Sequence, residues 1–350
     1  DPTFYNRTLD ALVVDELLGE WFPIFQTTSQ VDALGVKRLH ASLDVGRAPI
    51  DTYQNIGYGR AHELISDDDL AELFLHILSK QDGLAVAVEI LNMRFHGNAD
   101  ARQHSSNLVD VSREVLSLYP FPNERGRRDN QDYELNQIAN VGIIGKGGYN
   151  AALKLCENII DAVVNNKIYS FDYPELFNTI ARLQPRVFLD QFIGNEKVEN
   201  YHRKRIFENG IDERRNNPLN QISEEDLESW CDEDPVKRYP LAASVVQAFS
   251  KSGEPEQFEW KPIVYSLLQK APDVGEVLEN IAGSLYPSSW SGSLADALQR
   301  RVVLLEKLFD HDNAEIGAWA RSQYRTLLEE IKGERECEES RNRERNESFE

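Results

Sequence analysis

A chain of 350 residues with 41% hydrophobic and 28% charged residues has enough apolar side chain to build a folded core, which excludes a disordered polymer. Its formal net charge of -21 at pH 7 argues against general binding to a nucleic-acid backbone or an anionic bilayer, because both depend on Lys and Arg. The three cysteines, Cys156, Cys231 and Cys337, lack the spacing of a zinc site or a disulfide framework.

The N-terminal residues lack the basic and then apolar order of a signal peptide, and no stretch approaches the roughly 18 uninterrupted apolar residues that span a bilayer. We therefore expect a cytoplasmic location and no membrane partner. The chain starts at Asp1 without an initiator Met and enters a helical pattern almost at once. We expect it to be a segment of a longer protein, and a complete reading frame starting near Asp1 would contradict this expectation.

A helical hairpin is predicted for residues 66 to 97. Ser66, with Asp69 three residues later, resembles a capping box, and the acidic residues that follow Ser66 favour the positive end of a helix. One helix face then carries Leu70, Leu73, Phe74, Ile77 and Leu78. Gly83 breaks the pattern, and a second face carries Leu84, Ala87, Val88, Leu91 and Phe95 before Gly97. Two helices joined by so short a turn must lie antiparallel.

Shorter helices are predicted through the middle of the chain, each introduced by Ser, Pro or a charged residue. They run from Ser223 to Trp230, from Val236 to Phe249, from Trp260 to Gln269 and from Val274 to Leu285. Strand patterns are scarce because no Asn-Gly or Asp-Gly turn separates alternating β-branched runs. The best strand candidate is the short stretch from Lys167 to Asp172.

A second hairpin is predicted near the C-terminus. Ser291 or Ser293 starts a helix whose apolar face carries Leu294, Leu298, Val302, Leu305 and Leu308. Asp312 caps the next helix, whose apolar face carries Ile316, Trp319, Ala320, Tyr324, Leu327 and Ile331. The tail from residue 333 onward has almost no apolar residues.

The predicted class is all-α, as a right-handed α-solenoid of HEAT/ARM-like helical hairpins, because hairpins recur with a period of roughly 30 to 45 residues and each leaves an apolar face for its neighbour. Four-helix or irregular helical packing is the structural alternative. We expect N-terminal hairpins (1–119), a loop or boundary (120–132), a central helical segment (133–194), a charged loop (195–222), C-terminal helical repeats (223–332) and a charged tail (333–350) that is either helical or disordered.

The segment from Asp312 to Ala320 resembles the second-helix pattern of HEAT repeats, in which Asp caps the helix, an aliphatic residue fills the core and a small residue packs at the hairpin contact. Asp312, Ile316 and Ala320 match this pattern, whereas Gly317 stands where the family usually has Arg. The stretch from Pro287 through the tail resembles the C-terminal end of large bacterial multidomain proteins that join helical repeats to an ATPase or effector, many of them in anti-phage defence. The resemblance implies a sensor or scaffold role in a bacterium.

Two patterns suggest a site, but each favours a structural interpretation. The glycine-rich run from Ile144 to Gly148 lacks the Gly-Lys-Ser/Thr ending of a phosphate-binding loop, so a turn between helices is favoured. Four histidines come closest to clustering in sequence, but no metal-ligand spacing joins them: His62, His76, His96 and His104.

Glu259 and Lys261 have the spacing of metal-dependent nucleases, with Asp234 as the distant carboxylate. Lys261 is followed by Pro262 and an apolar helical run, and Trp260 between the two residues has the character of a core anchor. The structural interpretation is again favoured. We therefore expect no catalytic residue, no metal site and no cofactor.

Basic residues concentrate in the two predicted loops, and these are the candidate binding residues. The set is Arg125, Arg127 and Arg128 in one loop, and Tyr201, Arg203, Lys204, Arg205, Arg214 and Arg215 in the other. Such clusters are suited to clamping a phosphate, a nucleic-acid end or an acidic partner, with Tyr201 and His202 available for stacking. A solvated charged face is the simpler interpretation, because the net charge of the chain opposes polyanions.

The sequence therefore predicts a non-catalytic helical-repeat scaffold or sensor module, not an enzyme, within a larger bacterial defence-type protein. Its expected partner is another protein or a copy of itself, because repeat solenoids present extended binding surfaces. The alternative is a nucleic-acid-binding or nuclease-associated module that uses the basic loops; nucleic acid is otherwise disfavoured by charge.

Overall fold

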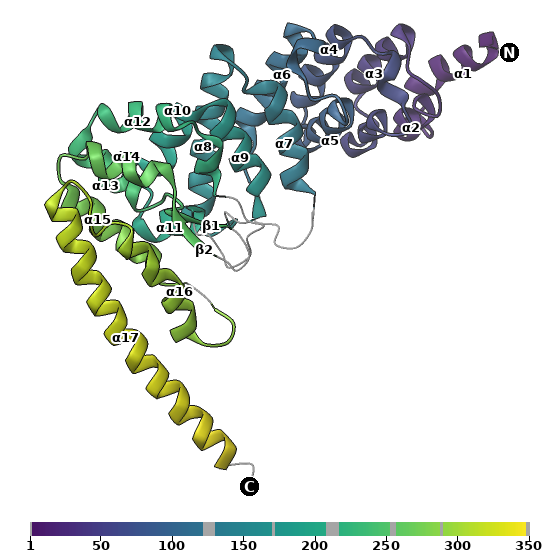
Figure 1. The fold of residues 1–350 in the computed structure, drawn as a ribbon. Coiled ribbons are helices and arrows are strands. Elements are labelled where there is room, and N and C mark those ends of the chain that lie inside the picture. The colour runs from purple at the N-terminus through teal and green to yellow at the C-terminus, as the bar shows by residue number, and fades with distance from the viewer. Residues whose placement is uncertain are drawn as a thin grey trace. The chain divides into compact units, whose positions relative to one another are not determined.

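The computed structural model describes residues 2–121, 130–169, 172–207, 217–252, 257–287 and 290–347 (Figure 1). The chain divides into two compact units, residues 1–191 and 192–350. Helices make up most of both units, and the described residues form strands in one short antiparallel pair. The predicted all-α class is confirmed at this level.

The first unit is built from short and medium-length helices. Its elements are α1 (Pro2–Val14), η1 (Gly19–Trp21), α2 (Phe22–Gln26), α3 (Ala33–Val45), η2 (Ile50–Gly57), η3 (Ala61–Leu64), α4 (Asp67–Leu78), α5 (Gly83–Phe95), η4 (Ala101–Gln103), α6 (Ser106–Leu118), α7 (Gln131–Gly142), η5 (Lys146–Gly148), α8 (Tyr149–Val164), α9 (Pro174–Leu183) and α10 (Pro185–Phe188). The π-helix η7 (Leu189–Ile193) runs across the boundary between the units.

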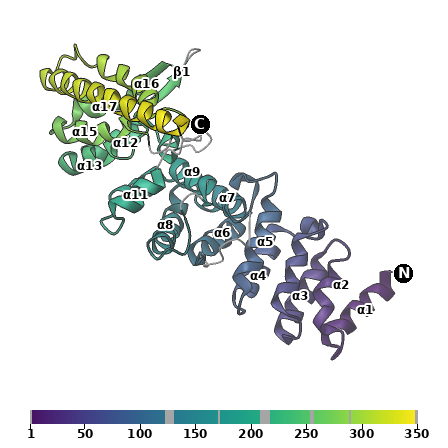
Figure 2. The same cartoon turned by 90° about the horizontal axis from the view of Figure 1, so that it is seen from below.

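The helices of the first unit form two layers (Figures 1 and 2). One layer takes α1, α3, α4, α6 and α8 in turn, and the other takes α2, η2, α5, α7 and α9. Each of these elements packs against the next one in its own layer. Such packing lets every helix bury an apolar face against a neighbour, which a single hairpin cannot do alone.

The hairpin of α4 and α5 has the boundaries that the sequence predicts. The Ser66 hydroxyl accepts the N–H of Asp69 at 3.1 Å, so the predicted N-cap is confirmed. Leu73 and Phe74 on α4 and Leu91 on α5 are fully buried, as their spacing requires. At Gly83 a Cβ would lie 1.9 Å from the carbonyl oxygen of Ile77, so only glycine allows the two helices to meet at this turn.

The second unit carries longer helices at its C-terminal end. Its elements are α11 (Asn200–Phe207), η8 (Pro218–Gln221), α12 (Glu224–Asp232), α13 (Pro235–Ala243), β1 (Phe249–Ser252), β2 (Gln257–Trp260), α14 (Pro262–Lys270), α15 (Val274–Ala282), η9 (Gly283–Leu285), α16 (Leu294–Glu306) and α17 (Ala314–Glu347). The helix predicted from Val236 to Phe249 is therefore too long, because the chain leaves the helix after Ala243 and enters β1.

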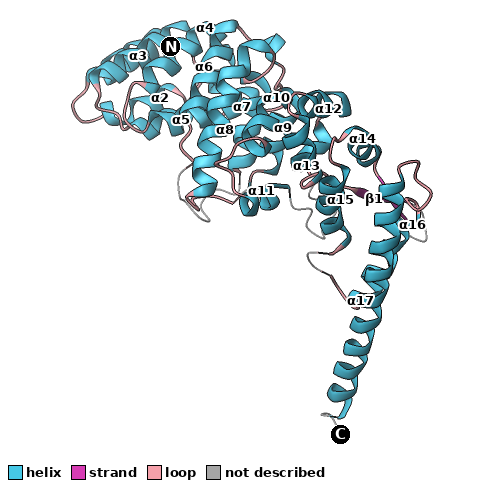
Figure 3. Ribbon diagram, turned by 90° about the vertical axis from the view of Figure 1, so that its left-hand side faces the viewer, coloured by secondary structure: helices cyan, strands magenta, loops and turns pink. Residues whose placement is uncertain are grey.

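The two strands form a hairpin that the sequence does not predict. Phe249 pairs with Trp260, and β2 packs against α16 (Figure 3). The indole N–H of Trp260 donates to the carbonyl of Leu304 at 2.7 Å, and the Arg301 guanidinium lies over the Phe249 ring. The hairpin is thus held by aromatic side chains against a helix, which a two-stranded sheet needs to be stable. Residues 167–169 and Asp172, the described part of the predicted strand from Lys167 to Asp172, form no strand.

The helix α16 packs against α17, which continues past it to Glu347 (Figure 1). The described part of the tail is therefore helical. Glu338 on α17 accepts the Ser293 hydroxyl at 2.7 Å and the N–H of Leu294 at 2.8 Å, so a carboxylate from one helix caps the other. Asn313 accepts the N–H of Glu315 at 2.9 Å, so it, and not Asp312, supplies the cap of α17.

Other predicted boundaries also shift. The range 195–222, expected to be a charged loop, contains α11 and η8, and the division between the units falls at Gln191. In the predicted loop 120–132, residues 122–129 lie outside the described residues, and α7 already starts at Gln131. Trp21 and Trp290, whose large aromatic side chains favour a place in a core, are 50% and 49% exposed. Of the helices within the described ranges, none is both long and apolar enough to cross a bilayer.

Side-chain hydrogen bonds between elements recur at a similar separation along the chain. In the first unit the pairs Asp10 and Arg38, His40 and His76, Asp67 and Ser105, Asn136 and Thr179, and Asn140 and Arg182 are separated by 28, 36, 38, 43 and 42 residues. In the second unit the pairs Glu196 and Lys237, Glu228 and Lys270, Trp260 and Leu304, and Ser293 and Glu338 are separated by 41, 42, 44 and 45 residues. These separations are close to the period of roughly 30 to 45 residues expected for repeated hairpins.

Candidate functional site

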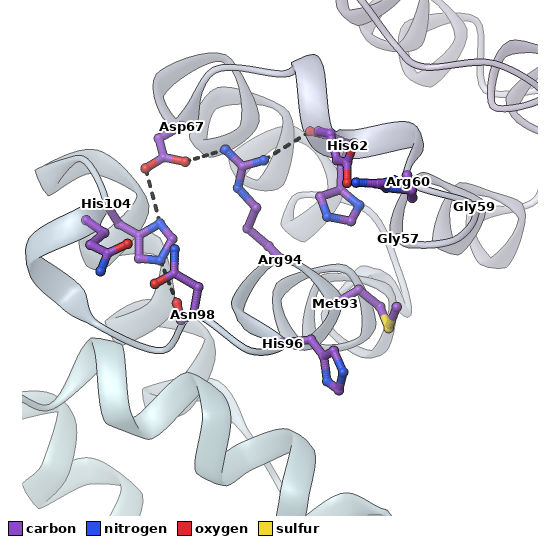
Figure 4. Close-up of a pocket in the computed structure, with 12 residues that line it drawn as sticks. Gly57, Gly59, Arg60, His62, Asp67, Met93, Arg94, His96, Asn98 and His104 are labelled. Carbon is purple, nitrogen blue, oxygen red and sulfur yellow. Dashed lines mark hydrogen bonds and ion pairs between the residues drawn. The ribbon is translucent and has the colours of Figure 1, made fainter.

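A pocket of about 500 Å³ lies in the first unit, between the η2 to η3 region, the start of α4, the end of α5 and η4 (Figure 4). Titratable side chains are concentrated in its lining. The lining residues are Gly57, Gly59, Arg60, His62, Glu63, Asp67, Met93, Arg94, His96, Asn98, Gln103 and His104. Pockets lined by several ionisable groups are candidates for binding or catalytic sites.

An ion pair between Asp67 and Arg94 forms the centre of this cluster. Arg94 Nη2 lies 2.7 Å from Asp67 Oδ1, and the two side chains are only 17% and 15% exposed. The same guanidinium donates to the carbonyl oxygens of His62 at 3.1 Å and Ile65 at 3.2 Å. Arg94, on α5, therefore holds both the start of α4 and the segment that precedes it.

His104 joins the cluster from the other side of Asp67. Its Nδ1 lies 3.3 Å from Asp67 Oδ2, and its Nε2 lies 3.1 Å from the carbonyl oxygen of Asn98. Both ring nitrogens therefore face acceptor oxygens. The ring edge packs against Phe95, with the ring centroids 4.8 Å apart.

Asp67 also reaches the beginning of α6. Its Oδ2 accepts the N–H of Ser105 at 2.9 Å, and Ser105 in turn caps α6 through the N–H of Leu108. Burial opposes ionisation of Asp67, but the Arg94 and Ser105 hydrogen bonds and the charge of Arg94 outweigh it and lower the pKa of this carboxyl. Asp67 is thus an ionised residue that ties three successive helices together.

The chemistry open to this cluster is limited, because its charged groups are used within the protein. Asp67 and Arg94 form hydrogen bonds with each other and with backbone atoms. Burial lowers the pKa of His62, and its Nδ1 faces the carbonyl of Ile56 at 3.2 Å. Within the described ranges, three or more His, Cys, Asp or Glu side chains do not gather in a way that could hold a metal ion. The cluster therefore acts as a structural clamp between neighbouring hairpins.

The predicted basic site falls partly outside the described residues. Arg125, Arg127, Arg128, Arg214 and Arg215 lie there, as do the side chains of Lys204 and Arg205. On α11, Tyr201 is 61% exposed, whereas Arg203 is only 7% exposed and donates to the carbonyl of Val198 at 2.9 Å. The structure thus places Tyr201 at the surface and Arg203 in the interior, and the binding role of the set stays a prediction.

The residues of the nuclease-like pattern do not meet at one site. Lys307 lies 3.4 Å from Glu259, while the Lys261 ammonium donates to Asn220 Oδ1 at 2.8 Å and to Gln247 Oε1 at 2.6 Å. Asp234 instead accepts the N–H of Lys237 at the start of α13. The three residues of the pattern therefore have separate structural partners.

The glycine-rich run forms the turn between α7 and α8, as the sequence predicts. Gln184 donates to the carbonyl oxygens of Ile143 at 2.5 Å and Gly145 at 2.7 Å, which fixes the turn. A Cβ on Gly148 would lie 2.2 Å from the carbonyl carbon of Ile143. Close packing of the backbone explains Gly148, and a φ of +63° explains Gly145.

Replacing Gly148 with alanine is expected to lower the free energy of unfolding by about 1 to 3 kcal/mol, because the backbone must move to relieve the clash. The matched control is Gly147→Ala, whose Cβ would meet the end of the flexible Arg113 side chain at 2.7 Å. Urea denaturation followed by circular dichroism at 222 nm measures both. A larger loss for Gly147→Ala than for Gly148→Ala would contradict this account.

A pair of histidines joins α3 and α4 in the same unit. The Nδ1 atoms of His40 and His76 lie 3.0 Å apart, their rings are stacked, and His76 Nε2 lies 3.3 Å from Asp44. One Nδ1 must donate and the other accept, so the contact is lost when both carry a proton. Burial, with the charge of His76, lowers the pKa of His40.

Acidification below pH about 6.5 is expected to destabilise the protein through His40 and His62. Both have a pKa below the ordinary 6.5 in the folded state, so the unfolded state binds more protons as the pH falls. The stability that they contribute is present above that pH and is lost below it. The check is urea denaturation at pH 7.5 and 5.5 of the wild type and of His40→Gln/His62→Gln. If the free energy of unfolding changed equally with pH in the wild type and in the double variant, the pH dependence would not come from His40 and His62.

Sequence reasoning does not find the cluster around Asp67. In the sequence, Asp67 is one of the acidic residues that follow Ser66, and His104 is one of four histidines without metal-ligand spacing. The available signal was their separation, because Asp67 and His104 are 37 residues apart, close to one repeat.

Comparisons with protein-family models, with curated proteins and with solved structures returned no match. The resemblance of the segment from Asp312 to Ala320 to HEAT repeats therefore stays a prediction, and no relative assigns a family or an activity to this chain.

Proposed function

We propose that this chain is a non-catalytic helical-repeat scaffold, a right-handed α-solenoid of HEAT/ARM-like hairpins that binds a protein partner or assembles with copies of itself. The observation that carries the proposal is the layered order of the first unit, in which each helix packs against the next one in its own layer. Side-chain hydrogen bonds separated by about one hairpin support it, because nearest-neighbour bonding is typical of repeat proteins.

The use of the ionisable residues also favours a scaffold over an enzyme. Asp67, Arg94 and His104, which line the pocket, bond to one another and to the backbone of adjacent helices. A catalytic acid or base must be able to form a hydrogen bond to a substrate. The internal bonds of these side chains leave few positions free for such a bond. The resemblance of the C-terminal stretch extends the proposal to a sensor for a catalytic domain in a larger bacterial defence-type protein.

Affinity capture from bacterial lysate, with and without phage infection, tests the proposal when it is followed by reconstitution. The immobilised full chain is the bait, and a captured protein is purified and mixed with the chain for calorimetric titration. Analytical ultracentrifugation measures self-association in parallel. A saturable complex with one purified protein, or a defined oligomer, would support the scaffold. Neither complex nor oligomer at micromolar concentration would overturn it.

Binding of fluorescent single- and double-stranded DNA to the same preparation tests the nucleic-acid alternative. Because Arg203 is buried, the variant that neutralises both basic loops leaves it in place and changes Arg125, Arg127, Arg128, Lys204, Arg205, Arg214 and Arg215 to alanine. DNA binding at moderate salt that this variant loses would replace the scaffold with a nucleic-acid-binding module, because phosphate contacts depend on these cations.

A further inference from the structure

Two carboxylates line the pocket in the first unit, and both are already engaged. Each oxygen of Asp67 and Glu63 has a hydrogen-bond partner within the protein. The partners are Arg94, Ser105 and His104 for Asp67, and Arg60 and Gln30 for Glu63. The pocket therefore has little acceptor capacity for a ligand that brings hydrogen-bond donors.

Donors of the lining, by contrast, are still available. Arg60 donates from Nε to Glu63 at 2.5 Å, and its terminal nitrogens bond to none of the residues that the structure describes. Arg94 donates from Nη2 to Asp67 and Ile65 and from Nη1 to His62, which leaves its Nε–H and an N–H of Nη1. Guanidinium N–H groups are well suited to the oxygens of carboxylate and phosphate.

The charges of the lining cancel, although the chain as a whole is strongly acidic. Arg60 pairs with Glu63, and Arg94 pairs with Asp67 at 2.7 Å. The other titratable residues of the lining are histidines, which add no negative charge. The neighbouring acids Asp68 and Asp100 are bonded to Asn107 and Arg102. An anion in the pocket therefore meets less repulsion than the net charge of -21 implies.

Arg60 also has a strained backbone conformation. Its φ is +66°, and it follows Gly59, whose φ is +58°. The left-handed region is unfavourable for a residue with a Cβ atom, and glycine would adopt it without strain. The Arg60 side chain is 80% exposed, so its ion pair with Glu63 contributes little to stability. Neither burial nor the ion pair accounts for an arginine here, and strained residues of this kind cluster at binding sites.

The space beside these groups has the size of a small-molecule site. The cavity of about 500 Å³ falls within the range of about 300 to 1,000 Å³ that is usual for such sites. Arg94 reaches between Asp67 and His62, which fixes its guanidinium (Figure 4). On the exposed rim, His96 contacts the Tyr133 hydroxyl through Nδ1 at 2.9 Å, which leaves its Nε2 for a ligand.

We infer that this pocket binds a small ligand through an oxyanion group, a carboxylate or a phosphate, which Arg60 and the remaining N–H groups of Arg94 hold. The inference goes beyond the proposed scaffold function, because the ligand is a small molecule and not a protein surface. Arg94 also belongs to the clamp with Asp67, whereas Arg60 serves the ligand. Arg60 is therefore the residue to change in a test.

Calorimetric titration of the full chain with sodium phosphate and with sodium succinate, at pH 7 and constant ionic strength, tests the inference. Saturable binding of one of these anions is expected, with an affinity that falls as sodium chloride is raised. Binding of neither anion at about 10 mM would overturn the inference. A short glutamate-rich peptide that binds at least about tenfold more tightly than both anions would also overturn it, because an acidic partner protein would then replace the small ligand.

Two variants of Arg60 and one control locate the binding. Arg60→Gln is expected to weaken the anion at least about tenfold, because hydrogen bonds from a charged donor are lost. Lys154→Gln, which removes a cation from another exposed ion pair three residues apart, is expected to leave the affinity unchanged. Unchanged affinity in Arg60→Gln, or equal weakening by Lys154→Gln, would overturn the inference.

Arg60→Gly separates binding from folding. Glycine adopts the positive φ of this position without strain, so the variant is expected to keep about the same free energy of unfolding in urea. It should nevertheless lose the anion as Arg60→Gln does. Anion binding by Arg60→Gly with the affinity of the wild type would show that the arginine side chain does not hold the ligand.

Discussion

Replacing Asp67 with alanine is expected to lower the free energy of unfolding by about 3 to 5 kcal/mol, because it leaves the Arg94 guanidinium buried without a counter-charge. The Ser105 N–H and His104 Nδ1 lose their acceptor at the same time. Urea denaturation followed by circular dichroism at 222 nm measures the loss.

Asp68→Ala is the matched control for this prediction. Asp68 lies in the same first turn of α4, but it is exposed and bonds to the exposed Asn107 side chain at 3.0 Å. Both variants remove a negative charge from the helix start, which is worth about 0.3 to 1 kcal/mol. The difference between their free energies of unfolding therefore measures the contribution of the bonds from Asp67 to Arg94, His104 and Ser105. Similar losses for the two variants would show that the clamp contributes nothing.

The effect of Asp67 should also depend on pH in a defined direction. Its pKa is lowered in the folded state, so its contribution is present above the ordinary carboxyl range and is lost as the pH falls through the folded value. The difference in stability between the wild type and Asp67→Ala should therefore narrow in strong acid.

Trp260→Ala is expected to lower the free energy of unfolding by about 3 to 5 kcal/mol, the range for removing a buried aromatic side chain. Trp260 is 5% exposed, packs with Phe249 and donates to Leu304, so it fastens the strand hairpin to α16. Urea denaturation again measures the change. Trp290→Ala, at a residue 49% exposed, should change the stability by less than about 0.5 kcal/mol. A comparable loss at Trp290 would contradict the assignment of Trp260 as an anchor.

Local signals in the sequence predict local structure well. Ser66 and Asp69 are three residues apart and form the predicted cap, and the apolar spacing of α4 and α5 matches their buried faces. These features depend on helix geometry alone, so a pattern of a few residues determines them.

Features that depend on packing between distant elements are not predicted from local patterns. The strands escape detection because each has four residues: β2 alternates exposed and buried side chains, but its contact with α16 joins segments far apart in the sequence. Trp21 has an aromatic side chain typical of a core, but it is 50% exposed at the end of η1. The cluster of Asp67, Arg94 and His104 forms only when successive hairpins pack.

The similar separation of the side-chain hydrogen bonds has a consequence for how the chain folds during synthesis. The bonds from Asp67 to Ser105 and from Glu228 to Lys270 close over 38 and 42 residues, so the entropy of bringing their ends together is modest. At about 5 to 20 residues per second, a stretch of that size leaves the ribosome in about 2 to 8 s, whereas helices form in about a microsecond. Each hairpin can therefore dock on the one before it while the next is still being made.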